Sequence, residues 1–152
     1  MIIWVDADAC PRHALTITRE IAATFGLAVW TVSSYRHEFT HEQHITVDAS
    51  PQATDLAILA RLTGGDVVVT QDYGLAALVL VRGGHAMSPS GKRYTSDNID
   101  QMLFERDLAA RARRSRKAFH VKGPAPRTGE DDRRFANQLE LLLAEVTPLE
   151  TN

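Results

Sequence analysis

Residues 1–11 read M-I-I-W-V-D-A-D-A-C-P, and this stretch decides the fold. The four apolar residues at positions 2–5 are typical of a strand that is buried on both faces. Pro11 suits the first position of a helix, because the N–H that proline lacks has no helical partner there. The stretch therefore predicts a strand that leads directly into a helix. In a parallel α/β sheet such a turn lies at the carboxyl edge, where these folds bind their ligands.

Two carboxylates follow this first strand, Asp6 and Asp8. If the backbone stays extended across residues 6–8, both side chains point to the same side. Like charges held so close repel each other unless a cation lies between them. The pair is consistent with a metal site, and also with Asp8 as a helix cap beside a solvated Asp6 at the end of the strand.

Length and composition fit one ordinary globular domain covering residues 1–152. The net charge of −2 gives no overall field that would point to nucleic acid or membrane. The single cysteine, Cys10, excludes an internal disulfide and fits a reducing compartment. No apolar run reaches the ~18 residues of a membrane span, and the N-terminus lacks the basic start of a signal peptide. We therefore expect a cytoplasmic protein with no membrane partner.

Further along the chain, short apolar runs alternate with segments of helical periodicity. This alternation predicts a three-layer α/β/α fold with a mostly parallel central sheet. The expected strands cover residues 2–5, 27–32, 44–48, 66–71 and 85–88, and the expected helices cover residues 11–25, 50–63, 72–82, about 95–110 and about 130–146.

Topology selects which acidic residues can meet. Acids that follow a strand, or lie in the first turn of the next helix, share the carboxyl edge of the sheet, whereas Asp66 opens its strand and lies roughly 20 Å from the other end. The acids expected at the carboxyl edge are Asp6, Asp8, Asp55 and Asp72. Carboxylate oxygens suit Mg²⁺ or Mn²⁺ better than zinc, and such a site supports hydrolysis of phosphate esters.

Several weaker candidates accompany these acids. Ser33, Ser34 and Thr70 end strands at the same edge and are expected to orient water or phosphate. Asn98 and Asp100, where a later helix begins, are candidate further ligands. The basic segment at residues 111–122 offers Arg113, Arg114, Lys117 and Lys122 as phosphate contacts, and it also fits a solvated helix end favoured by the helix dipole.

Three blocks of sequence carry a resemblance to a known family: D-A-D-A-C-P at 6–11, G-D-V-V-V-T-Q-D-Y-G-L-A at 65–76, and R-Y-T at 93–95 with Asn98-Ile99. Together they resemble the signature of the uncharacterised bacterial YaiI/YqxD family, and matches at 106–107, 123–124 and 132–135 extend the resemblance. That family is regarded as similar to PIN-like nuclease domains. The resemblance implies that Asp6, Asp55 and Asp72 ligate Mg²⁺ or Mn²⁺ for cleavage of RNA. In this hypothesis Asp8 is a further ligand or the general base. PIN-like domains usually add another acid in a later loop or helix start, where this sequence offers Asn98 or Asp100.

Other functions are also open from the sequence. A non-catalytic RNA- or nucleotide-binding module would use the same acids and basic segment, and a small-molecule phosphatase would use the acids alone. The segment His37–His41 matches the H-E-x-x-H pattern of zinc proteases, but it lies between two expected strands and lacks the periodicity of a packed helix. We interpret that match as fortuitous, and Cys10 as a small buried residue rather than a nucleophile.

Overall fold

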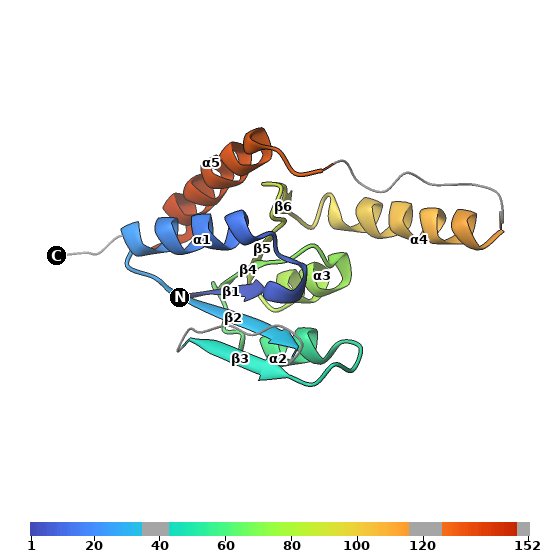
Figure 1. Cartoon of the computed structure of the whole chain (residues 1–152), viewed down its shortest axis with the longest axis horizontal. Coiled ribbons are helices and arrows are strands. Elements are labelled where there is room, and N and C mark those ends of the chain that lie inside the picture. The colour runs from blue at the N-terminus through green and yellow to red at the C-terminus, as the bar shows by residue number, and fades with distance from the viewer. Residues whose placement is uncertain (35–42, 116–125, 149–152) are drawn as a thin grey trace.

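A computed structural model describes residues 1–34, 43–115 and 126–148. Six strands form one sheet in the order β3-β2-β1-β4-β5-β6 (Figure 1). The strands are β1 (Ile2–Asp6), β2 (Ala28–Ser34), β3 (His44–Val47), β4 (Val67–Val69), β5 (His85–Met87) and β6 (Arg93–Tyr94). The helices are the short 3₁₀ helix η1 (Ala7–Ala9), α1 (Arg12–Thr24), α2 (Ala53–Arg61), α3 (Tyr73–Val81), α4 (Ile99–Ser115) and α5 (Gly129–Val146).

The first five strands run parallel, and this confirms the mostly parallel sheet expected from the sequence. β6 is an antiparallel edge strand that the sequence did not predict. With two residues it is too short to show an alternating pattern. The turn before it depends on Gly91, whose φ of +91° is one that L side chains rarely adopt.

Alternate residues of the central strands face two separate apolar layers. Ile3 and Val5 of β1 point to the layer beneath α1 and α5, which Phe135 and Leu139 of α5 complete. Trp4 points to the opposite layer, where α2, α3 and the start of α4 pack against the sheet. Because successive strand residues alternate in direction, one five-residue strand supplies both layers. The expected three-layer α/β/α architecture is confirmed.

Asp66 lies at the amino edge of the sheet and is almost fully buried. One carboxylate oxygen accepts a hydrogen bond from the Ile2 backbone N–H at 2.9 Å, and the other accepts from Trp4 Nε1 at 3.1 Å and from Thr63. These bonds hold the pKa of Asp66 below its ordinary value of 3.8. The residue thus joins β1 to the turn before β4, and its exclusion from the group of acids at the carboxyl edge is confirmed.

The two C-terminal helices differ in how they pack. α5 covers one face of the sheet and begins with a capping box between Thr128 and Asp131. α4 packs against α3 at its start and then extends away from the sheet (Figure 1). Its C-terminal part carries Arg111, which pairs with Asp107, and the exposed Arg113 and Arg114, whereas residues 116–122 of the basic segment lie outside the described residues. Within the described part of the chain, no helix has the length and apolarity needed to cross a membrane.

Candidate active site

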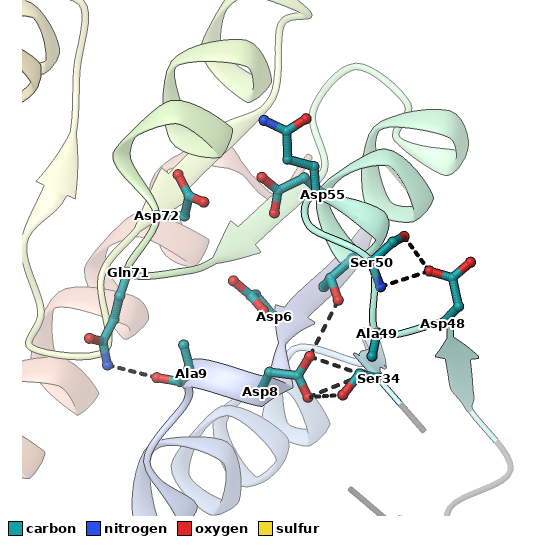
Figure 2. A pocket seen from close by; sticks show the side chains of 12 residues that line it. Asp6, Asp8, Ala9, Ser34, Asp48, Ala49, Ser50, Asp55, Gln71 and Asp72 are labelled. Atoms are coloured by element: carbon teal, nitrogen blue, oxygen red, sulfur yellow. Dashed lines mark hydrogen bonds between the residues drawn. The ribbon is translucent and has the colours of Figure 1, made fainter. Parts of the chain in front are cut away.

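The strand order reverses at β1: β2 pairs with one edge of β1, and β4 pairs with the other. Ligands of open α/β sheets bind outside the carboxyl ends of the strands at such a switch point. A pocket of about 490 Å³ lies there (Figure 2). Its lining includes all four acids that the sequence predicts at this edge: Asp6, Asp8, Asp55 and Asp72.

Asp6 is the last residue of β1 and only 8% exposed. Its Oδ2 accepts a hydrogen bond from Thr70 Oγ1 at 2.9 Å, and that hydroxyl oxygen accepts from the backbone N–H of Asp72 at 3.0 Å. Burial raises the pKa of Asp6, the Thr70 bond opposes the rise, and the charges of Asp8 and Asp72 add to it. Thr70 therefore links the Asp6 side chain to the Asp72 backbone. The sequence predicted only that Thr70 orients water or phosphate at this edge.

Asp55 and Asp72 come from helix starts on neighbouring elements. Asp55 lies in the first turn of α2, and burial followed by the charges of Asp72 and Asp6 raises its pKa from 3.8 to about 6. Asp72 caps α3 by accepting from the Leu75 N–H at 3.1 Å. The charges of Asp72 and Asp6 therefore add to the effect of burial at Asp55, because the three carboxylates line one pocket.

Asp8 reaches the same pocket by a different backbone path from the one expected. β1 ends at Asp6 and η1 follows, so the backbone is not extended across residues 6–8. The Asp8 carboxylate accepts from the Ser34 backbone N–H at 2.9 and 3.1 Å and from Thr54 Oγ1 at 3.4 Å. It thereby joins η1 to β2 and α2, and this use of its oxygens favours a positioning role over that of a general base.

The weaker candidates fall in different places. Ser33 is buried and pairs with His44 Nε2 at 3.1 Å, and its neighbour Ser34 lines the pocket instead, because alternate residues of a strand face opposite sides. Asn98 holds the turn before α4: its Oδ1 accepts from the Thr95 N–H and its Nδ2 donates to the Arg93 carbonyl, each at 2.9 Å, and its own N–H donates to Thr95 Oγ1 at 3.3 Å.

Asn98 and the exposed Asp100 are both absent from the lining of this pocket. Lys117 and Lys122 lie outside the described residues, as does the H-E-x-x-H segment at 37–41.

Further polar residues at the site were missed from the sequence, among them Asp48, Gln71 and Arg106. Asp48 directly follows β3 and lines the pocket, so the strand-end rule that selected Asp6 would have found it. Gln71 also lines the pocket, and its Nε2 donates to the Ala9 carbonyl at 2.7 Å. Arg106 Nη1 lies 3.9 Å from Asp72 Oδ1. Nothing in the sequence signals this last contact, because it depends on how α4 packs over α3.

The donor set of the pocket fits a hard divalent cation in chemistry and charge. Burial and the charges of neighbouring carboxylates raise the pKa values of Asp6 and Asp55, so both would gain from a positive charge in the pocket. Among the described residues, no group of three or more His, Cys, Asp or Glu side chains is already arranged to hold a metal ion. Binding a cation would therefore require the three side chains to adjust.

Cys10 is close in sequence but takes no part in this cluster. It is partly buried against the apolar layer beneath α1 and α5. Burial is the largest of the effects that raise the pKa of its thiol to about 12. Because the thiolate is the reactive form of cysteine, the structure agrees with its interpretation as a packing residue.

Comparison with known proteins places the whole site within one family. The model of the uncharacterised YaiI/YqxD family matches residues 4–145. A UPF0178 protein of Heliobacterium modesticaldum is 44% identical over 145 residues, which cover 95% of this chain and 98% of the relative. Similar relatives occur in Clostridium acetobutylicum, 44% identical over 89% of this chain and 91% of the relative, and in Exiguobacterium sibiricum, 40% identical over 97% and 99%. No solved structure matches the chain.

Proposed function

We propose that this chain, which belongs to the uncharacterised YaiI/YqxD family, is a metal-dependent nuclease. It would hydrolyse phosphodiester bonds, with RNA as its substrate. The names of its relatives state no activity, so the proposal depends on the site. The observation that carries it is the meeting of Asp6, Asp55 and Asp72 in one pocket at the switch point, with raised pKa values at Asp6 and Asp55. The resemblance to PIN-like nucleases supports the same assignment.

In this proposal Asp6, Asp55 and Asp72 would hold Mg²⁺ or Mn²⁺. The bound cation would polarise a phosphoryl oxygen and make water a stronger nucleophile. Thr70 bonds to both Asp6 and Asp72 and so holds them in place. Asp8 bonds to Ser34 and so connects η1 to the end of β2. Arg106, half-exposed beside Asp72, is placed to bind a phosphate oxygen that enters the pocket.

Exposed arginines at the C-terminal end of α4 make nucleic acid a suitable substrate. Arg113 and Arg114 are exposed on the last turn of α4, where they would contact phosphates along the strand together with Lys117 and Lys122. Removing one phosphate-binding side chain should reduce the slope of log binding constant against log salt by about 0.7 for a single strand. An unchanged slope in Arg113→Ala with Arg114→Ala would remove this surface from the proposal.

The test is cleavage of end-labelled single-stranded RNA in Mn²⁺, in Mg²⁺ and in EDTA. We expect cleavage in the presence of a cation and a loss of about a hundredfold or more in Asp6→Asn and Asp72→Asn, because a bound metal contributes several kcal/mol. Asp97→Asn is the matched control, since Asp97 is exposed and outside the pocket.

Two results would contradict the proposal. Cleavage that survives in both site variants would come from elsewhere. RNA binding without cleavage in either cation would favour the non-catalytic RNA- or nucleotide-binding module.

A further inference from the structure

A second pocket, of about 600 Å³, adjoins the acidic one. Gln71 lines both, so the two pockets lie on either side of this side chain. The walls of the second pocket come from the turn after β4, from the β5–β6 hairpin and from residues 126–131 at the start of α5. Neither the acids of the first pocket nor the basic end of α4 belongs to it.

One wall of this pocket is apolar and aromatic. It includes Tyr73 and Met102. The Tyr73 ring packs edge-on against Tyr94, with 5.8 Å between ring centroids, and the buried Tyr94 hydroxyl donates to the Thr70 carbonyl at 3.0 Å. Tyr73 is therefore a half-buried ring held in place by its neighbour. A fixed aromatic ring lining a pocket is the kind of surface on which a nucleobase stacks.

The other wall presents Arg127 with an incomplete set of hydrogen bonds. Its Nε donates to Asp132 Oδ1 at 2.6 Å, and its Nη1 donates to the Pro89 carbonyl at 2.6 Å. Its Nη2 is shielded from solvent, and none of the described residues offers it an acceptor. A shielded donor without an acceptor is costly, and a turn of the guanidinium toward the pocket would let a phosphate oxygen accept from it.

The aspartates around the second pocket are paired with other residues, so Lys92 is available to bind an anionic ligand. Asp131 lines the pocket, but its oxygens accept from Thr128 and pair with Arg134. Asp132, beside it, pairs with Arg127 and His13. Lys92 is exposed at the rim, and within the described part of the chain no carboxylate pairs with it. The rim therefore suits an anion, in contrast to the carboxylates of the adjoining pocket.

We propose that this second pocket binds one nucleotide, with its phosphate toward Arg127 and Lys92 and its base against Tyr73. A nucleotide matches both features, because Lys92 and Tyr73 line one cavity and a nucleotide carries a phosphate and a base. Its position next to the acidic pocket makes it the site for the nucleotide beside the cleaved bond, and this last step rests on the proposed function.

The experiment is an NMR titration of the full chain in EDTA, followed through the backbone amides. The probes are adenosine 5′-monophosphate, adenosine and inorganic phosphate. Without a cation the acidic pocket repels phosphate, so binding under these conditions reports the second pocket. We expect saturable shifts at Gln71, Ser90, Lys92 and Thr128 with the nucleotide. Its affinity should exceed that of each half by about tenfold or more, because base stacking and phosphate binding then act together.

Two variants and a control sharpen the result. Lys92→Ala and Tyr73→Leu should each weaken nucleotide binding by about five- to tenfold. Arg61→Ala should leave binding unchanged, because Arg61 is an exposed cation at the far end of α2 and outside this pocket. The amide spectrum of each variant shows whether it is folded. The titration of the wild-type chain tests the proposal even if a variant fails to fold.

Absence of saturable shifts at these amides would overturn the proposal. Equal affinity for phosphate and nucleotide would overturn it as well, because the aromatic wall would then take no part. The titration uses no cation and no cleavage, so it fails or succeeds independently of the nuclease assay. Nucleotide binding here in a protein that cleaves no RNA would contradict the proposed function and leave the second pocket established.

Discussion

Replacing Asp55 with asparagine is expected to stabilise the cation-free protein at pH 8. The pKa of Asp55 rises from 3.8 to about 6 in the folded protein, mainly through burial and the charge of Asp72. At about 1.4 kcal/mol per pKa unit, the full rise corresponds to about 3 kcal/mol of destabilisation by the ionised group. Solvent screens a half-buried carboxylate, which reduces this to roughly 1–2 kcal/mol. We expect the lower end of this range, about 1 kcal/mol, because the asparagine amide also loses hydration on burial.

The pH dependence follows from the sign of the shift. The folded state binds a proton at Asp55 more tightly than the unfolded state, so the contribution of this group to stability falls as pH rises from about 4 to about 6. Above that range the wild-type protein carries the full penalty and Asp55→Asn carries none. We therefore expect the variant to melt about 2–4 °C higher at pH 8 and to lose this advantage near pH 4.

Thermal unfolding with and without Mg²⁺ completes the test. At about ten times its Kd, the cation should stabilise the wild-type protein by about 1.4 kcal/mol, and Asp55→Asn should lose most of that gain. Glu140→Gln, at an exposed position on α5, is the control and should behave as wild type. If Asp55→Asn is no more stable than wild type at pH 8, the acids do not repel one another as inferred, and their charges give no reason for a cation between them.

Four other outcomes are expected. Thr70→Val should destabilise the protein by ~1–3 kcal/mol in urea unfolding, because Asp6 loses its buried hydrogen bond, and an unchanged midpoint would contradict this. Asp66→Asn should cost ~2–4 kcal/mol. Since the pKa of Asp66 is lowered, its contribution is present at neutral pH and is lost as pH falls below 3.8. Cys10 should resist iodoacetamide at pH 8 until the protein is unfolded, as mass spectrometry would show. Gly91→Ala should lower the melting temperature, because a Cβ there lies 3.0 Å from the α5 backbone.

The sequence determined the layers of the fold and most of the acidic pocket. Apolar runs with β-branched residues, separated by helical periodicity, leave little choice but a parallel sheet between helices. Once the strands are placed, chain direction alone assigns Asp6, Asp55 and Asp72 to one edge and Asp66 to the other. This assignment needs no side-chain geometry, and the structure confirms that these three acids meet in one pocket.

Only the tertiary structure decided the features that depend on packing between distant segments. The bend that takes Asp8 into η1, the approach of Arg106 to Asp72 and the second pocket around Arg127 all bring together residues that share no local pattern. A periodic pattern records which side of an element is buried, because burial repeats with the backbone. It does not predict which side chain of another element contacts that buried face, because the packing of the helices against the sheet decides this.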